Sequence, residues 1–438
     1  MNGRGVWFLL LLPLFLNACA TTDNTLTAGD YTRTIRKLQE RLVANPQDGE
    51  ALRDLGVIAF ETKQYFQARD YLKKSSLVND HDGKTLFYLG MTQEYANDLP
   101  GALASYLNYT DLAESSQYRK LMEGRYQAVA RELIAVQFRA LAANEDSLGK
   151  RSTPSSAVAV FPLVYQGTDQ KFSSLGLGLA EMMTIDLGYV KKIKLVERMR
   201  VEELMTELKF GASGAVDPAT APRLGKFLAA GRIVGGRYAV GADNTLRLDV
   251  ASLDVARGKQ PETSTESDDL GNLFKVQKEV VFQVVKTMGI TLTRDEREKI
   301  QRIPTKNLQA FIAYSIGLER EQEGDFGAAG VYFRQASTLD PGFAPAAAAA
   351  EISDARNAAG PTKETALAAS NSLSPPPAPD ARNQHFSSQA LLAQRLQKLD
   401  SMINLGFIPG EDSRKPAQDV GSAGALVNVL PPPPRPPQ

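Results

Sequence analysis

The residue types that most often carry covalent or metal chemistry are scarce in this chain, which holds one Cys and two His among 438 residues. Cys19 is the only thiol, which excludes an internal disulfide and a Cys-based zinc site. His81 and His385 lie far apart in sequence, which excludes a multi-histidine metal site and disfavours most histidine-based acid–base mechanisms. Neither histidine has a neighbour that suggests a nucleophile–base pair. The sequence therefore predicts a binding or assembly protein, with no catalytic, metal or cofactor site, rather than an enzyme.

The single thiol lies at the end of a short apolar segment. Arg4 provides a positive start, and residues 5–16 form a nearly continuous apolar run. This run is too short to cross a bilayer as a helix and is typical of a signal-peptide core. The following Leu16-Asn17-Ala18-Cys19 resembles a bacterial lipobox, in which the cysteine is the nucleophile for lipid transfer. An ordinary signal peptide with a coincidental cysteine is the alternative.

The lipobox resemblance implies a lipoprotein signal peptide at 1–18 and an anchor linker at 19–29, with acyl chains such as palmitate on Cys19. Several acyl chains hold a protein at a membrane without a spanning helix. The residue after the cysteine is Ala20 rather than Asp, which by the same resemblance favours sorting to the outer membrane. We therefore expect a lipid-anchored protein on the periplasmic side of a bacterial outer membrane.

Length and charge bound the remaining possibilities. A chain of 438 residues suggests two to four domains. Basic and acidic residues number 50 each, so no global positive field would draw the protein to nucleic acid. Hydrophobic residues make up 43% of the chain and charged residues 23%, which is ordinary for a folded globular protein.

Apolar and small residues recur with a period of 34 between residues 30 and 145. Most positions of one unit hold a similar residue one period later, and the same offsets return in residues 304–358. The pattern indicates helix pairs whose small residues lie where the helices cross. The crossing positions are expected at Gly56, Ala68, Gly90, Ala102, Gly317 and Ala329.

This spacing resembles the tetratricopeptide repeat. The resemblance implies two antiparallel helices in each unit, with the glycine and the alanine of one unit facing each other closely. Neither helix buries its apolar stripe alone, so the units must stack. The resemblance also implies a surface that binds other envelope proteins. Unrelated helical hairpins are the alternative.

Residues 155–295 change to a pattern of strands and helices. An apolar run at 157–161, ended by Pro162, predicts a buried strand. Further strands are expected at 194–196, 232–240 and 246–255, with a last helix within 270–288. The last two strands alternate around a short turn and predict a hairpin. The order β-α-β-α-α-β-β-α predicts a small layered α/β domain.

Several positions in this region follow the ordered motifs of one family. They are Phe161, Gly176, Gly178, Val196, Glu197, Arg198 and Gly225. In this order they resemble the CsgG-like bacterial envelope lipoproteins, named for the curli-secretion channel. The resemblance implies a fold related to the N-terminal domain of TolB-type proteins. It also implies a domain that packs against copies of itself or against partners.

These motif residues are expected to be structural. Arg198 follows the end of a strand, and we expect it to bridge to a carboxylate or cap a carbonyl. Gly176 and Gly178 suggest a dinucleotide loop, but Glu181 occupies the third glycine position, so nucleotide binding is rejected. A basic cluster within 191–200 is expected to be a solvated face, with a partner contact as the alternative.

The last region, 359–438, is rich in Pro and Ala. Leucines at roughly helical spacing predict one helix at 386–405. The rest is expected to be disordered, although a proline tract also suits a recognition ligand. The expected fold is thus a small α/β domain combined with all-α repeats, followed by a disordered Pro-rich C-terminal tail.

The leading hypothesis for function is a non-enzymatic outer-membrane lipoprotein that acts in envelope assembly or transport. Its partners would be the membrane through Cys19, envelope proteins through the repeats, and further copies through the α/β domain. Nucleic acids and small-molecule substrates are not expected. A CsgG-type oligomeric secretion pore subunit is one alternative, and an outer-membrane activator of a peptidoglycan synthase is another.

Overall fold

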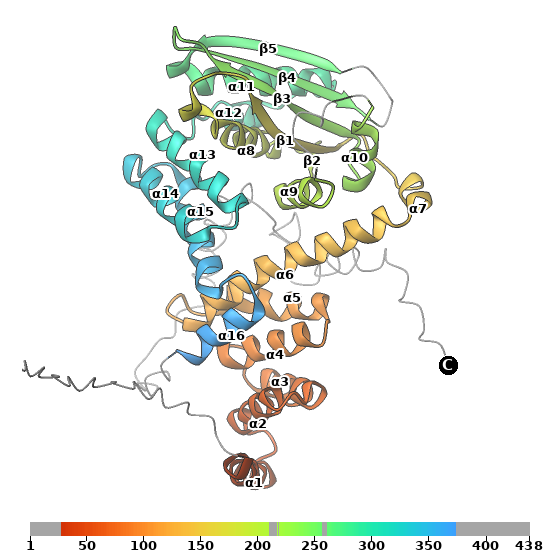
Figure 1. The fold of residues 1–438 in the computed structure, drawn as a ribbon, viewed down its shortest axis with the longest axis vertical. Coiled ribbons are helices and arrows are strands. Elements are labelled where there is room, and N and C mark those ends of the chain that lie inside the picture. The colour runs from red at the N-terminus through yellow and green to blue at the C-terminus, as the bar shows by residue number, and fades with distance from the viewer. Residues whose placement is uncertain (1–27, 210–216, 218, 256–260, 374–438) are drawn as a thin grey trace, which may run out of the picture.

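The computed structural model describes residues 28–209, 217, 219–255 and 261–373. Figure 1 shows a sheet domain at one end of the molecule and a stack of helices at the other. Cys19, the predicted signal peptide, most of the anchor linker, and the predicted helix at 386–405 lie outside these residues. Across the described ranges, no helix combines the length and the apolar composition needed to cross a membrane.

Within the described residues, a five-stranded mixed sheet has the order β2-β1-β3-β4-β5. Its strands are β1 (Ala157–Tyr165), β2 (Lys194–Leu195), β3 (Arg232–Val240), β4 (Thr245–Asp254) and β5 (Glu262–Asp269). β1 runs parallel to β2 and β3, whereas β3, β4 and β5 are antiparallel. The predicted combination of a small α/β layer with separate helices is therefore confirmed, as is the hairpin of β3 and β4.

The first strand does not end at Pro162 as predicted. β1 continues to Tyr165, and its pairing with β3 shifts register between Val160 and Leu163. Proline has no backbone N–H to donate to a neighbouring strand, so a local irregularity is the expected way to keep it inside a ladder.

The sequence reasoning missed β5, which follows β4 as an additional strand. Its segment, Glu262–Asp269, carries only Glu, Asp, Ser and Thr, so no apolar alternation marks it as a strand. The whole of β5 pairs with β4, from Thr245 opposite Asp269 to Ser252 opposite Glu262. Its place at the edge of the sheet explains the polar sequence, because charged side chains protect an edge from unwanted pairing.

Helices cover both faces of the sheet. They are α8 (Leu175–Gly188), α9 (Arg198–Glu207), α10 (Ala221–Leu228), α11 (Leu273–Thr287) and α12 (Arg294–Ile300). On one face, Val234 of β3 is buried in one core with Val280 of α11 and with α8. On the other face, Phe161 of β1 is buried with Phe227 of α10. This second core continues into the N-terminal helices, so the sheet domain and the helices share apolar contacts.

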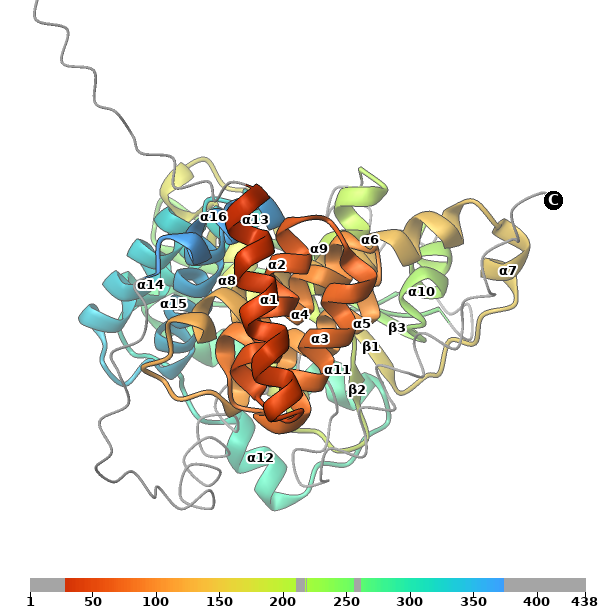
Figure 2. The same ribbon diagram turned by 90° about the horizontal axis from the view of Figure 1, so that it is seen from below.

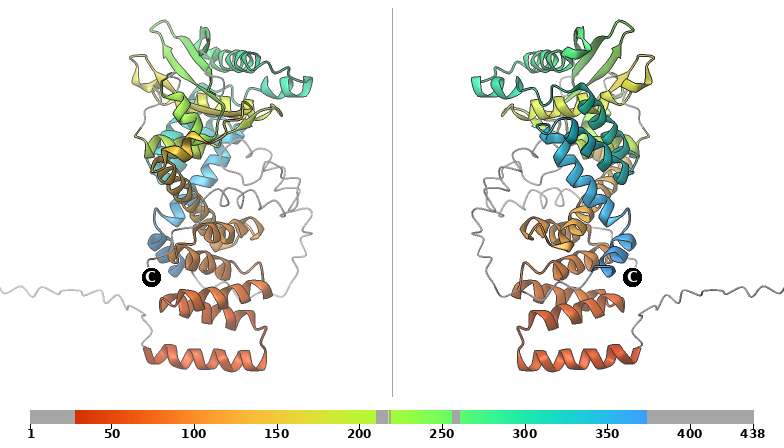
Figure 3. Two further views of the ribbon diagram at one scale, coloured as in Figure 1. Left: turned by 90° about the vertical axis from the view of Figure 1, so that its right-hand side faces the viewer. Right: turned by 90° about the vertical axis from the view of Figure 1, so that its left-hand side faces the viewer.

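The N-terminal helices stack in successive layers, as Figures 2 and 3 show from below and from the sides. They are α1 (Ala28–Ala44), α2 (Gly49–Glu61), α3 (Tyr65–Val78), α4 (Gly83–Tyr95), α5 (Leu99–Leu107) and α6 (Gln117–Ala142). The short helix α7 (Glu145–Gly149) follows α6 and lies beside α10 of the sheet domain. Asp48, Asp82 and Asp98 cap α2, α4 and α5, because each side chain accepts hydrogen bonds from first-turn N–H groups. The stack therefore consists of helical hairpins with defined starts.

The predicted glycines do lie where the paired helices cross closely. The residues that face them are not the predicted alanines. A Cβ on Gly56 would meet Leu72, and the equivalent atom on Gly90 would meet Tyr106. On Gly317 it would meet Phe333. Each partner lies one helical turn after the predicted alanine. Ala68, Ala102 and Ala329 are fully buried.

The C-terminal helices pack between the sheet domain and the N-terminal stack (Figure 1). They are α13 (Leu308–Gln322), α14 (Phe326–Leu339), α15 (Ala344–Ala359) and α16 (Lys363–Asn371). α13 and α14 form a hairpin, α13 packs on α8, and α15 packs along α6. Gly124 of α6 permits this last crossing, since a Cβ there would collide with the Ala355 carbonyl oxygen.

The region predicted to be low in complexity contains a folded element. α16 lies within 359–438, and it packs against α4, α6 and α15. Thr362 caps it, accepting from the Thr365 N–H at 3.2 Å. The sequence reasoning missed α16 because its nine residues are mostly Ala, Ser and Thr, without the large apolar stripe of a typical packed helix.

Candidate functional site

The candidate site is built around Arg198, the first residue of α9. Its guanidinium makes three ion pairs at once. Nη1 lies 2.9 Å from Glu202 Oε1 on α9, and Nη2 lies 3.0 Å from Glu321 Oε2 on α13. Nε lies 3.3 Å from Glu181 Oε2 on α8. Arg198 thus connects α8 and α9 of the sheet domain to the C-terminal helix α13. The expected bridge to a carboxylate is present.

Two further arginines extend these contacts to α6 and α15. Arg131 of α6 lies 2.9 Å from Glu202 and 2.8 Å from Glu203. Arg356 of α15 lies 3.1 Å from Glu321. We call these residues the junction cluster; its members are Arg131, Glu181, Arg198, Glu202, Glu203, Glu321 and Arg356. The cluster joins five helices at the place where the sheet domain and both groups of helices meet.

Burial and mutual attraction set the protonation of the junction cluster. Burial raises the pKa of Glu181 to about 7, against the attraction of Arg198. Burial also acts upward on Glu321, but Arg198 and Arg356 outweigh it and lower that pKa to about 2. Burial lowers the pKa of Arg356 to about 10. The four carboxyl groups balance the three guanidinium groups when Glu181 holds a proton.

Glu181 is the least satisfied member of the junction cluster. Its side chain is 1% exposed, and neither carboxyl oxygen has a hydrogen-bond partner among the described residues. The buried hydroxyl of Tyr314 on α13 also lacks a partner, and the charge of Glu181 helps to raise the pKa of this tyrosine, after burial itself. Burying an ionised carboxylate without hydrogen bonds is unfavourable, which explains why Glu181 favours its protonated form near neutral pH.

The glycines of the family motif lie where neighbouring elements approach closely. A Cβ on Gly176 would collide with the Leu163 carbonyl oxygen, and one on Gly178 would collide with Ser315 and Phe311 of α13. A Cβ on Gly225 would press against Val255 and the Ala230 carbonyl oxygen. These positions allow α8 and α10 to pack tightly.

The other motif residues belong to the sheet and its ends. Phe161 is fully buried on β1, and the Val196 N–H donates to the Val158 carbonyl at 2.8 Å. Glu197 is the N-cap residue of α9. Together with the glycines, these residues belong to the packing of the sheet and of α8, α9 and α10. They support the elements that carry Arg198.

Tyr238 of β3 supports the start of α8 and was missed by the sequence reasoning. Its hydroxyl accepts a hydrogen bond from the Gly176 N–H at 3.0 Å. The same hydroxyl lies 2.6 Å from the Phe172 carbonyl oxygen, to which it donates. A buried tyrosine hydroxyl thus satisfies backbone groups that would otherwise be unpaired.

Among the described residues, three other buried ion pairs were also missed. They are Lys278–Asp186 between α11 and α8, Arg232–Asp254 between β3 and β4, and Arg125–Glu94 between α6 and α4. Their partners are far apart in the sequence, so no local spacing marks them. Asp186 also accepts from Gln277 at 2.8 Å, and burial raises its pKa to about 6.

The predicted basic cluster divides into two groups. Lys191, Lys192 and Lys194 are exposed, as a solvated face requires. Arg198 and Arg200 instead point inward, Arg198 into the junction cluster and Arg200 toward Gln137 at 3.3 Å. The prediction was wrong for these two arginines because the chain turns from strand to helix between the lysines and them.

His81 is exposed on the turn between α3 and α4, where it contacts Asp80. In the described ranges, no three His, Cys, Asp or Glu side chains are arranged to hold a metal ion.

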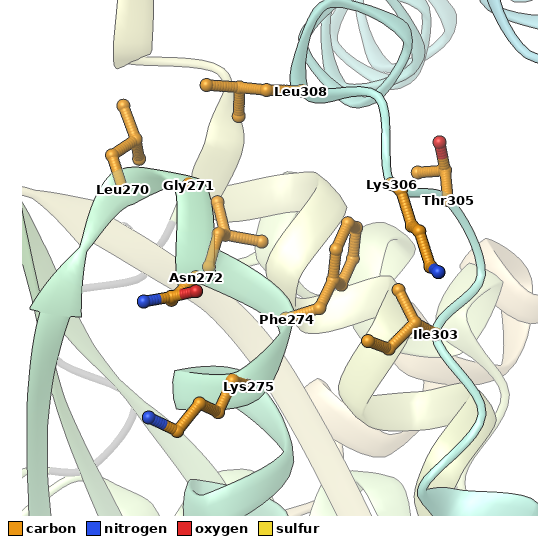
Figure 4. Close-up of a pocket in the computed structure, with 10 residues that line it drawn as sticks. Leu270, Gly271, Asn272, Phe274, Lys275, Ile303, Thr305, Lys306 and Leu308 are labelled. Atoms are coloured by element: carbon orange, nitrogen blue, oxygen red, sulfur yellow. The ribbon is translucent and has the colours of Figure 1, made fainter.

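A shallow pocket of about 260 Å³ lies between the start of α11 and residues 303–308 (Figure 4). Phe274 and Ile303 contribute apolar surface to it. In Figure 4, Lys306 reaches toward Ile303 while Lys275 points away from the pocket. The described lining residues include Thr305 and two lysines but no His, Cys, Asp or Glu.

Comparison with known proteins adds no assignment, because no protein-family model matches the chain and no curated protein matches it significantly.

Proposed function

We propose that this protein is a non-enzymatic lipoprotein of a bacterial outer membrane, anchored on the periplasmic side through Cys19. It acts as an interaction and assembly component in envelope biogenesis or transport. The junction cluster is the observation that carries the interaction role, and the lipobox resemblance at Leu16-Asn17-Ala18-Cys19 supports the anchor. It ties the sheet domain to both groups of helices through charged side chains that are engaged with one another. Such a junction holds binding surfaces in fixed relative positions.

The helical stack supports the tetratricopeptide-like part of the proposal. Gly56 and Leu72 repeat as Gly90 and Tyr106 one 34-residue period later, with the same close approach of two helices. Such repeats stack into extended surfaces that bind proteins. The repeats are therefore the proposed site for envelope partners.

The packing of the motif residues supports the CsgG-like part. A side chain on Gly176 would collide with the Leu163 carbonyl oxygen, and one on Gly178 would collide with side chains of α13. Arg198 occupies the centre of the junction cluster. A shared structural requirement of this kind is a physical reason for the family motif. We propose that the sheet domain contacts further copies or partners, as the resemblance implies.

The test combines lipid labelling with capture of partners in intact envelopes. Cells are labelled with radioactive palmitate, and the wild type is compared with Cys19→Ala and with the nearby control Thr21→Ala. We expect label and membrane attachment in the wild type and in Thr21→Ala, but not in Cys19→Ala. Crosslinking in intact envelopes should recover defined envelope proteins only with the anchored forms. Equal palmitate incorporation in Cys19→Ala would contradict the proposal.

A further inference from the structure

The C-terminal helix α16 occupies a surface of the N-terminal stack. It leaves α15 through Gly360, whose φ of +68° ends that helix, and Pro361. It then lies against α4 and α6, as the contacts between these helices and the views of Figures 1 and 3 show. The surface proposed to bind partners is thus partly covered by the chain itself.

Two hydrogen bonds set the register between α16 and α4. The Tyr88 hydroxyl donates to Asn371 Oδ1 at 3.3 Å, and the Tyr95 hydroxyl donates to Glu364 Oε1 at 3.2 Å. The tyrosines are seven residues apart on α4, and their acceptors are seven residues apart on α16. Seven residues are about two helical turns, so both pairs share one face of each helix. Because the later tyrosine meets the earlier acceptor, the helices run antiparallel.

Tyr88 and Tyr95, which contact α16, belong to a continuous cluster of aromatic rings. Its members, which we call the tyrosine face, are Phe60, Tyr65, Tyr88 and Tyr95. The Phe60 ring centroid lies 5.5 Å from that of Tyr88 and 5.4 Å from that of Tyr95. The Lys363 ammonium at the start of α16 lies 4.6 Å from the Tyr95 ring centroid. Aromatic rings whose hydroxyl groups donate hydrogen bonds suit a helix that brings both small apolar and polar side chains.

α16 itself contributes little apolar volume to this contact. Its buried side chains are Ala366 and Ser370, and Leu367 is half-buried. A helix of nine residues is too short to be stable alone, so its order depends on docking. Segments that hold few buried apolar contacts open at low free-energy cost. The tyrosine face is therefore occupied by a helix that a better-fitting helix would displace.

We propose that the tyrosine face is a helix-docking site, filled in cis by α16 and opened when a partner helix replaces it. The partner helix carries hydrogen-bond acceptors seven residues apart, with apolar residues between them, as Glu364 and Asn371 flank Ala366 and Leu367. This proposal deepens the proposed function, on which it rests for the existence of an external partner. The docking itself is testable with the chain's own helix.

The test uses a fluorescent synthetic peptide of residues 361–373 and the full-length protein. Fluorescence anisotropy measures peptide binding to the wild type, to Ala366→Asp and to Ala368→Asp. Ala366 is fully buried, so a charge there undocks α16, whereas Ala368 is exposed on the same helix and serves as the matched control. We expect Ala366→Asp to bind the peptide at least about tenfold more tightly than the wild type, since its site is vacant. Ala368→Asp should behave as the wild type.

Two controls assign the binding to the tyrosine face. A peptide that itself carries Ala366→Asp should not bind, and adding Tyr95→Ala to the Ala366→Asp protein should abolish binding. Hydrogen exchange reports whether α4 stays folded in each variant. Should Ala366→Asp unfold α4, the double variant Glu364→Gln, Asn371→Ala takes its place and is expected to bind the peptide.

Equal peptide binding by the wild type and a folded, undocked variant would overturn the proposal. This outcome is separate from the lipid-anchor test, because the peptide experiment requires neither a membrane nor an envelope partner. Peptide binding without recovery of envelope proteins would keep the docking site and remove the proposed function. Recovery of envelope proteins without peptide binding would keep the proposed function and remove the docking site.

Discussion

Arg198 and Glu321 form an ion pair of 3.0 Å across 123 residues of sequence, and this pair links the sheet domain to the C-terminal helices. Arg198 begins the helix that follows β2, whereas Glu321 lies in the last turn of α13. Glu202 also binds Arg198, and Arg356 also binds Glu321, so the Arg198–Glu321 pair is the centre of the junction cluster. Its contribution to stability can be measured directly.

Arg198→Ala should destabilise the protein by about 3–5 kcal/mol, the usual cost of leaving buried carboxylates without their partner. Glu181, Glu202 and Glu321 would all lose an ion pair. Urea unfolding followed by circular dichroism measures the change. Arg294→Ala is the control, because its ion pair with Glu298 is solvent-exposed and contributes only about 0–1 kcal/mol. Equal effects of both substitutions would show that the junction cluster does not stabilise the fold.

The raised pKa of Glu181 predicts a loss of stability as the pH rises. Its pKa is about 7 in the folded protein, against an ordinary value of 4.5. Between these values the folded state binds more protons than the unfolded state, so the free energy of unfolding falls as the pH increases. Glu181→Gln removes this dependence and should be the more stable form at pH 8. Denaturation curves between pH 5 and 8 test it, and parallel pH profiles of the two proteins would refute the assignment.

Glu321 should show the opposite dependence. Its folded pKa of about 2 lies below the ordinary value of 4.5. Its contribution to stability is therefore fully present above the ordinary pKa and is lost as the pH falls toward 2. Glu321→Gln should destabilise the protein at neutral pH, and the difference from the wild type should shrink in acid. A difference that stays constant from pH 7 to pH 3 would contradict this role.

Gly124→Ala should destabilise the protein, although Ala favours helices over Gly by about 1 kcal/mol. The added methyl group would collide with the Ala355 carbonyl oxygen where α6 crosses α15. Overpacking of this kind costs typically about 1–3 kcal/mol. Gly149→Ala is the control, since its Cβ would enter open space and should change stability little. A stabilised Gly124→Ala variant would show that the crossing is looser than described.

Tyr238→Phe should cost about 1–3 kcal/mol, because the Gly176 N–H loses its acceptor in a buried place. Tyr165→Phe is a matched control, since the Tyr165 hydroxyl donates to the Asp169 carbonyl at an exposed position. Thermal melting distinguishes the two, with a clear decrease in Tm expected only for Tyr238→Phe. Similar melting of both variants would mean that the hydroxyl of Tyr238 is dispensable.

Elements with strong local patterns could be predicted from the sequence, and elements without them could not. β1, β3 and β4 are recognisable because their apolar residues must meet a buried face. β5 has no such residues, since its place at the sheet edge requires none. α16 was missed for a similar reason, because the face of α4 that receives it supplies the large side chains.

The glycine crossings illustrate the limit of periodic patterns. The 34-residue period located Gly56, Gly90 and Gly317 at helix crossings, because a small residue recurs wherever two backbones approach. The period does not state which side chain fills the space opposite. Leu72 and Tyr106 do so, one turn beyond the predicted alanines, since helix tilt decides which turn faces the glycine.

The sequence by itself determined that Arg198 follows the end of a strand and needs an acceptor, either a carboxylate or a carbonyl oxygen, because a guanidinium is always charged. Only the tertiary structure decided which carboxylates these are. Glu181, Glu202 and Glu321 come from three helices, and their contacts exist only after α8, α9 and α13 have packed. The same packing decides their protonation, since a pKa depends on burial and on neighbouring charges that no local spacing specifies.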